Sequence, residues 1–185
     1  MRRASGRGTV TVGLNHYRFR SVWELDAPPD AVYAVLERAE EYPAWWPQVR
    51  EARRWDGGEG GADTGTARFR SLLPYDLRVT VRRTHGDPAA RVLQIAMTGD
   101  LDGWARWRLT PRAGADGGGD GGDGGTRALF EQEVEVRRPL LRLLAVPGRP
   151  LFRANHALMM RAGHRGLRRR LGEGREGRRA AGRPG

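Results

Sequence analysis

Six polar residues occupy positions that strand alternation or helical spacing assigns to an otherwise apolar face. They are the candidates for chemistry. Four belong to predicted strands and two to a predicted helix: Ser21, Ser71, Arg83, Gln132, Asn155 and His156. A guanidinium such as that of Arg83 stabilises an enolate or binds a carboxylate. A histidine such as His156 transfers protons near neutral pH. These two residues are therefore the candidates for catalysis, and the other four are candidates for orienting a bound molecule.

Both catalytic candidates also have a purely structural explanation. Arg83 lies near the end of its strand, where a charged head can reach water while the aliphatic stem stays packed. His156 can hydrogen-bond a neighbouring strand, as buried polar groups usually do. The residue types therefore leave open whether the protein is an enzyme.

Several kinds of chemistry are excluded by composition. The chain has no Lys, which rules out a phosphate-binding Walker A loop and any lysine Schiff base. It has no Cys, which rules out disulfides, cysteine zinc ligands and cysteine nucleophiles. None of its three Ser lies in a Gly-x-Ser-x-Gly turn, and its four His lack the spacing of paired metal ligands. We expect neither a metal nor a cofactor.

The net charge of +11 is concentrated at the two ends of the chain. All 33 basic residues are Arg, and residues 165–185 hold eight of them beside two Glu. The body between the ends is nearly neutral, which favours a solvated basic tail, and we expect no nucleic-acid partner. The alternative for this tail is contact with an anionic membrane or another partner.

No segment resembles a targeting or membrane-spanning sequence. The basic N-terminus is not followed by an apolar stretch, and the most apolar run, residues 140–147, is interrupted by Arg142. A membrane span needs about 20 apolar residues. Together with the absence of Cys, these features predict a cytoplasmic protein.

Alternation of apolar and polar residues predicts an antiparallel sheet with one dry face. A first strand over residues 17–25 precedes six more, which lie near residues 49–55, 67–73, 77–83, 93–97, 105–109 and 128–136. Between the first two strands, Pro28 and Pro29 begin a helix, and YPAWWP (42–47) predicts a second short helix or a turn. Adjacent residues of a helix face different ways, so we expect at most one of Trp45 and Trp46 to face inward. The alternative is that both are packing anchors.

A long helix over residues 150–171 is the predicted cover for the dry face. Phe152, His156, Met159 and Leu167 recur at helical spacing, and the helix is about 30 Å long, enough to cross the sheet. The prediction is an α+β fold with one domain over residues 15–171. Residues 1–14, the glycine-rich loop 112–125 and the tail 172–185 are predicted to be flexible or disordered.

Large apolar side chains share the inward face with the polar candidates. They are Trp23, Phe69, Trp107 and Phe130 on the strands, with Phe152 and Met159 on the helix. Such residues form either an ordinary core or the wall of a cavity. Aromatic walls with a few convergent polar groups are typical of a site for a small hydrophobic molecule.

The order of elements, together with YPAWWP, GDLDGWARWRLTP (99–111) and FRANHALMMRAGHRGLRRRL (152–171), resembles the polyketide cyclase/dehydrase-like branch of the START/Bet v1-like (SRPBCC) superfamily. The resemblance covers roughly residues 15–172. It implies a helix-grip fold, in which a curved sheet wraps a long C-terminal helix around a cavity for lipids, polyketides, isoprenoids or aromatic compounds.

Three functions follow as hypotheses. The resemblance implies either a cofactor-independent polyketide cyclase/dehydrase-like protein or a non-catalytic carrier or sensor of a lipid or isoprenoid. The basic C-terminus adds a third, a module that binds a partner or a membrane. The oligomeric state is left open.

Overall fold

The alternating segments form seven strands that pair into one antiparallel sheet. The computed structural model describes residues 15–55, 64–70, 76–112, 125–137 and 149–181. The strands are β1 (His16–Leu25), β2 (Val49–Trp55), β3 (Thr64–Arg70), β4 (Asp76–Asp87), β5 (Val92–Gly99), β6 (Leu101–Arg112) and β7 (Gly125–Val136). Their order in the sheet is β1-β7-β6-β5-β4-β3-β2. The predicted strand, short helices, six strands and long helix are confirmed.

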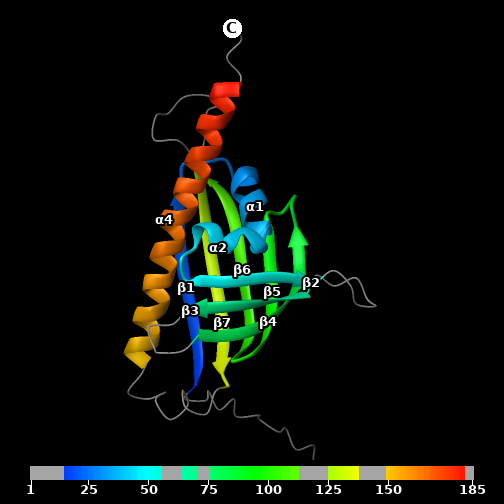
Figure 1. Ribbon diagram of the computed structural model, residues 1–185, viewed down its shortest axis with the longest axis vertical. Coiled ribbons are helices and arrows are strands. Elements are labelled where there is room, and N and C mark those ends of the chain that lie inside the picture. Colours follow the sequence, from blue (N-terminus) through cyan, green and yellow to red (C-terminus); the bar gives the residue numbers. More distant parts are fainter. Residues whose placement is uncertain (1–14, 56–63, 71–75, 113–124, 138–148, 182–185) are drawn as a thin grey trace, which may run out of the picture.

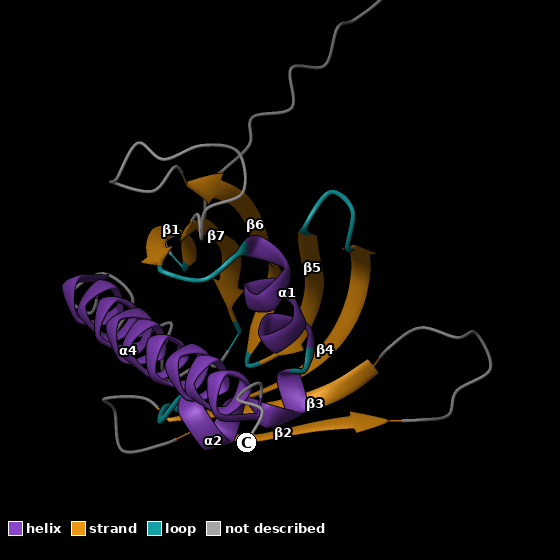
Figure 2. Ribbon diagram, turned by 90° about the horizontal axis from the view of Figure 1, so that it is seen from above, coloured by secondary structure: helices purple, strands orange, loops and turns teal. Residues whose placement is uncertain are grey.

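The helices lie on the concave side of this sheet. They are α1 (Pro29–Glu37), the 3-10 turn η1 (Ala39–Glu41), α2 (Tyr42–Trp45) and α4 (Arg149–Ala181). The sheet curves around α1, and α4 runs between β1 at one edge and α2 near the other (Figure 2). Figure 1 shows α4 lying along the side of the sheet and extending past its end. This arrangement is the predicted helix-grip fold.

Helix α4 is longer than the sequence predicted. Its expected end at Leu171 is wrong, because the helix continues to Ala181 through part of the tail predicted to be disordered. Glycines weaken this stretch, but the Arg, Glu and Ala residues between them favour helix, and each residue added to an existing helix gains a backbone hydrogen bond. No helix in the described part of the chain is long and apolar enough to cross a membrane.

The remaining segments predicted to be flexible lie outside the described residues. These are residues 1–14, residues 113–124 of the glycine-rich loop and residues 182–185. The two residues that flank the loop, Arg112 and Gly125, pair with each other at the ends of β6 and β7.

The core forms on the face that alternation predicted to be dry. In β1, Tyr17, Trp23 and Leu25 are buried, whereas Arg18 and Arg20 are exposed. The same cluster takes in Val32 and Leu36 from α1, and Leu167 from α4. Sheet and helices therefore share one hydrophobic core.

Helix α4 contacts α2 through two glycines. A β-carbon added to Gly166 would lie 1.7 Å from the carbonyl oxygen of Trp45, and one added to Gly163 would lie 2.5 Å from the Trp46 ring. Trp46 also donates a hydrogen bond from Nε1 to the carbonyl oxygen of Met159, at 2.9 Å. Only glycine permits so close an approach of a helix to these groups.

Both tryptophans are buried, and of the two only Trp46 lines a cavity, in agreement with the expectation that at most one faces inward. Helix α2 has a single turn, and Trp46 follows it with an extended backbone (φ −113°, ψ 94°). The two side chains are therefore not held to different faces of one helix. Both residues also pack against α4, as the packing alternative predicts.

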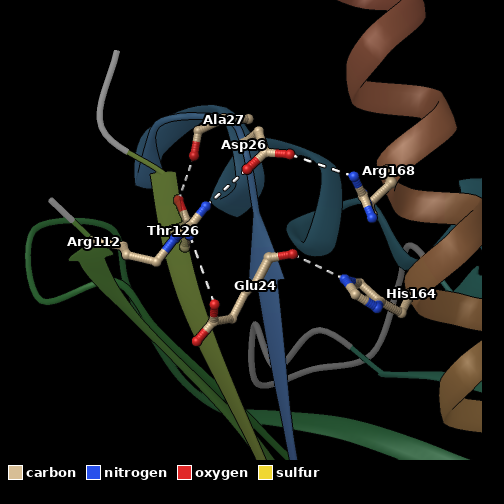
Figure 3. Close-up of polar contacts among 7 residues, drawn as sticks. All are labelled: Glu24, Asp26, Ala27, Arg112, Thr126, His164 and Arg168. Atoms are coloured by element: carbon tan, nitrogen blue, oxygen red, sulfur yellow. Dashed lines mark hydrogen bonds and ion pairs between the residues drawn. The ribbon is translucent and has the colours of Figure 1, made fainter. Parts of the chain in front are cut away.

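A set of polar contacts holds α4 to the end of β1 (Figure 3). His164 donates a hydrogen bond from Nε2 to the carbonyl oxygen of Glu24, at 2.9 Å. Arg168 on the same helix lies 3.4 Å from the carboxylate of Asp26, which also binds Arg112 of β6 at 2.7 Å. These contacts fix where α4 lies along β1.

Because of the α2–α4 contact, replacing glycine by alanine at two positions of α4 should have opposite effects on the free energy of unfolding. Gly166→Ala should lower the free energy of unfolding by about 1–3 kcal/mol, because its β-carbon overlaps the Trp45 carbonyl. Gly172→Ala has no atom within 4 Å of the new β-carbon, and it should stabilise the helix by up to about 1 kcal/mol. Urea unfolding followed by circular dichroism measures both. Equal effects of the two substitutions would contradict this description of the contact.

Candidate functional site

A cavity of about 200 Å³ lies between the sheet, the short helices and α4. Its walls are mainly apolar and come from β2–β7, α1, η1, α2 and α4; they include Val81, Leu93, Ile95, Met97, Trp107 and Phe130. We call it the larger cavity. The sheet supplies most of its wall. Residues two apart in a strand face the same side, so one strand can contribute several side chains to the wall.

A smaller cavity of about 80 Å³ adjoins it, nearer to β1 and the first turns of α4. Tyr17, Phe19, Leu101, Val134, Phe152 and His156 line only the smaller cavity. Four residues line both cavities and therefore form the boundary between them: Phe69, Met97, Gln132 and Met159.

The two volumes indicate the size of molecule that fits. An apolar cavity of about 150 Å³ holds benzene, and sites for drug-sized ligands begin at about 300 Å³. The larger cavity exceeds the first value, and the two cavities joined together come close to the second. Met97 and Met159 on the boundary have flexible side chains that can move aside. A molecule of two fused rings is therefore of a suitable size.

Nine of the twelve sequence-predicted site residues line these cavities. Arg83, Trp107 and Phe130 line the larger one, Phe152, Asn155 and His156 the smaller one, and Phe69, Gln132 and Met159 both.

Of the other three predicted residues, two line neither cavity and one lies outside the described residues. Ser21 is half-buried in β1, opposite Phe130 of β7. Trp23 is buried, and its ring lies 4.7 Å from that of Trp107 and 5.5 Å from that of Trp46, so it fills the core. Ser71 lies outside the described residues.

At the larger cavity, Arg83 forms an ion pair with Glu37 of α1. Its Nη1 lies 3.0 Å from Oε1 of Glu37, and its side chain is 26% exposed. Both residues line the cavity. A bulge in β4 between Arg83 and His85 interrupts the alternation at this point. Because an acidic ligand carries the same charge as Glu37, it can take the place of that carboxylate on the guanidinium.

The hydroxyl of Tyr33 is close to this ion pair. It is buried without a hydrogen-bond partner among the described residues. Removal from water, with a smaller contribution from Glu37, raises the pKa of Tyr33. The hydroxyl is therefore neutral, and it can act as a hydrogen-bond donor.

At the smaller cavity, His156 is held between aromatic rings. Its ring is stacked on that of Phe19, with centroids 3.9 Å apart and planes 8° apart, and Phe130 lies 6.0 Å away. The residue is 9% exposed. Burial lowers its pKa to about 4. The imidazole is neutral at pH 7 and a weak base, which favours hydrogen bonding over proton abstraction.

Several lining residues were not among the predicted site residues. Ile95 and Met97 lie on the inward face of β5, and Phe19 lies on that of β1, so alternation did carry a signal for them. No sequence pattern identifies Glu37 as a lining residue, because its proximity to Arg83 depends on how α1 lies on the sheet. The described residues contain no group of three or more His, Asp or Glu that could hold a metal ion.

The buried histidine predicts an acid-sensitive contribution to stability. Between its folded pKa of about 4 and the ordinary value of 6.5, the unfolded chain binds a proton at His156 that the folded protein does not. The free energy of unfolding therefore decreases as the pH falls through this range, by up to about 3 kcal/mol from this residue. Urea unfolding at pH 7, 5 and 4 should show a smaller decrease for His156→Phe than for the unchanged protein. The same decrease in both would contradict the burial of a neutral imidazole.

Comparison with known proteins places this chain in a family. A model of the family described as polyketide cyclase/dehydrase and lipid transport matches residues 16–172. No curated protein matches the chain.

Solved structures share the fold at low sequence identity. The Zhui aromatase/cyclase from Streptomyces sp. R1128 is 19% identical, with a TM-score of 0.66 over 90% of this chain and 98% of its own. A START superfamily protein from Mycobacterium smegmatis is 15% identical, with a TM-score of 0.63 over 84% and 97%. The di-domain ARO/CYC BexL from the BE-7585A biosynthetic pathway is 17% identical, with a TM-score of 0.61 over 86% of this chain and 51% of its own. These identities support a common fold and no more.

Proposed function

The chain belongs to the polyketide cyclase/dehydrase and lipid transport family of START-like (SRPBCC) proteins, and from this premise we propose that it binds a planar, largely hydrophobic molecule between the sheet and α4. The observation that carries the proposal is the apolar cavity of about 200 Å³ with its smaller neighbour. A polyketide-derived aromatic compound is the ligand class that fits best.

The walls of the larger cavity favour flat rings. Trp107 and Phe130 lie side by side, with ring centroids 4.8 Å apart, and both are anchored in the sheet. Burying apolar surface contributes about 25 cal/mol per Å², and aromatic pairs add to this when their rings are offset or tilted. Because the rings are already fixed by the core, little conformational freedom is lost when a ligand binds.

The polar groups of the cavity support cyclisation as the reaction. An aromatase/cyclase is among the proteins of similar fold. In an intramolecular aldol addition, an enolate carbon forms a bond to a carbonyl carbon, and the resulting alkoxide takes up the proton released on enolisation. Arg83 would stabilise the enolate charge, and the cavity would hold the chain folded, so that proximity supplies most of the acceleration.

A non-catalytic carrier of the same ligand class is the second candidate. The observation that favours it is the low pKa of His156, which makes the strongest proton-transfer candidate a weak base. The third hypothesis, a basic C-terminal module, has less support. Arg168 and Arg170 of α4 pair with Asp26 and Glu41, so part of the basic surplus is neutralised within the fold.

Blocking the larger cavity should abolish ligand binding. Ala67 lines this cavity, so Ala67→Trp fills it, whereas Ala96→Trp adds the same side chain at a position opposite Trp104 that lines neither cavity. N-phenyl-1-naphthylamine, whose fluorescence rises in apolar surroundings, should bind the unchanged protein and Ala96→Trp but not Ala67→Trp. No fluorescence rise with the unchanged protein, or equal binding to both variants, would overturn the proposal.

Arg83 should determine the affinity for acidic ligands. Arg83→Met should weaken binding of 2-naphthoate by roughly 10-fold or more, the value of a charge-assisted hydrogen bond, and leave binding of neutral 2-naphthamide nearly unchanged. Isothermal titration calorimetry measures both. Glu37→Gln, which removes the competing carboxylate, should strengthen binding of 2-naphthoate. Equal losses for the acid and the amide in Arg83→Met would assign Arg83 a packing role only.

Turnover of a poly-carbonyl substrate mimic distinguishes enzyme from carrier. If Arg83→Met keeps affinity for neutral ligands but loses product formation, the protein is a cyclase. Binding of the mimic by the unchanged protein without any cyclised product identifies a carrier.

A further inference from the structure

We propose that the smaller cavity is a subsite for a hydroxyl group of the ligand, which hydrogen-bonds Nε2 of His156 while the rings of the ligand occupy the larger cavity. The inference rests on the proposed function and narrows its ligand class to hydroxylated aromatic molecules, phenols above all. It assigns His156 to binding and to the choice of ligand.

The first observation is an unsatisfied polar atom. His156 is more than nine-tenths buried, it lines the smaller cavity, and its Nε2 has no hydrogen-bond partner among the described residues. Buried polar atoms in folded proteins are nearly always paired, so an exception at the wall of a cavity points to a partner that enters the cavity.

A second histidine of α4 provides the contrast. His164 lies two turns further along the helix, is stacked against Trp23 at 5.6 Å, and donates its hydrogen bond to the carbonyl oxygen of Glu24 (Figure 3). His156 has the same kind of aromatic contact but lacks a hydrogen bond at Nε2. Aromatic packing on β1 therefore does not by itself explain the unsatisfied atom of His156.

The position of the imidazole is fixed before any ligand enters. Stacking on Phe19 and the nearby ring of Phe130 hold its plane, and the helix holds its backbone. Gln132, on the boundary of the two cavities, is a second residue able to hydrogen-bond a ligand there. A group that reaches the smaller cavity from the larger one thus meets a preorganised site.

The chemistry of the subsite fits a hydroxyl better than a charged group. A neutral imidazole nitrogen is either a donor or an acceptor, and a hydroxyl can match both states. A carboxylate would leave water for a mainly apolar space, which is costly, because the cation in its described lining, Arg70, is exposed to solvent and already hydrated. The cavity of about 80 Å³ exceeds the volume of about 30 Å³ that one water molecule takes up in the liquid. It can therefore hold a hydroxyl and the ring edge that carries it.

The test compares phenols with the parent hydrocarbon in two matched variants. Affinities of 1-naphthol, 2-naphthol and naphthalene are measured by displacement of N-phenyl-1-naphthylamine. His156→Phe keeps a ring stacked on Phe19 but has no nitrogen, and it should weaken binding of at least one naphthol by roughly 10-fold while leaving naphthalene unchanged. His164→Phe makes the same substitution outside the cavities and should change neither affinity.

Equal weakening of naphthol and naphthalene by His156→Phe would overturn the subsite, because it would show a packing role. Unchanged affinities would overturn it too, since Nε2 would then be satisfied by water alone. Failure of both the fluorescent probe and naphthalene to bind the unchanged protein would count against the proposed function itself. Binding of the probe without selectivity for the hydroxyl would remove only the subsite.

Two further measurements separate this effect from a loss of folding. His156→Phe removes an unpaired buried atom and should leave the melting temperature unchanged or raised at pH 7, whereas His164→Phe loses a hydrogen bond and should lower it. In the unchanged protein labelled with ¹⁵N-histidine, the Nε2 resonance of His156 should shift on addition of naphthol and not of naphthalene. Identical spectra with the two compounds would overturn the proposal without any variant.

Discussion

The structure depends on how closely α4 approaches Trp45 and Trp46, the two tryptophans at the end of α2. Gly163 and Gly166 leave no room for a β-carbon at this contact, and Trp46 donates a hydrogen bond to the backbone of α4 at Met159. Trp46 and Met159 also line the larger cavity. The contact that fixes the helix therefore also sets the distance between the helix and the sheet, and with it the size of the cavity.

The larger and the smaller cavity differ in their polar groups. Arg83 and Glu37 form an ion pair at the larger cavity, and the neutral His156 lines the smaller one, with Gln132 on the boundary between them. Apolar and aromatic walls supply affinity for many flat molecules, so the polar groups must supply selectivity. A ligand with an acidic group near one end and a hydroxyl near the other would satisfy both.

The sequence was sufficient to predict the fold and many of the residues that face the candidate site. Alternation assigned Phe69, Trp107, Phe130 and Gln132 to the inward face, and helical spacing did the same for His156 and Met159. Alternation shows which face a residue occupies but not how far along the strand a cavity extends. For this reason Ser21 and Trp23 were included although they line neither cavity. The Glu37–Arg83 pair and the unsatisfied Nε2 of His156 arise from tertiary contacts between distant segments, which no local pattern records.

The methionine methyl groups allow the most direct test of the central claim that the two cavities form one ligand site. Met97 and Met159 line both cavities, whereas Met160, which follows Met159 in the sequence, is buried and lines neither. In protein labelled with ¹³C at the methionine methyls, titration with 2-naphthol should shift the resonances of Met97 and Met159 and leave Met160 nearly unchanged. If Met97 and Met159 do not shift, or if all methionines shift alike, the ligand binds elsewhere or not at all, and the account is contradicted.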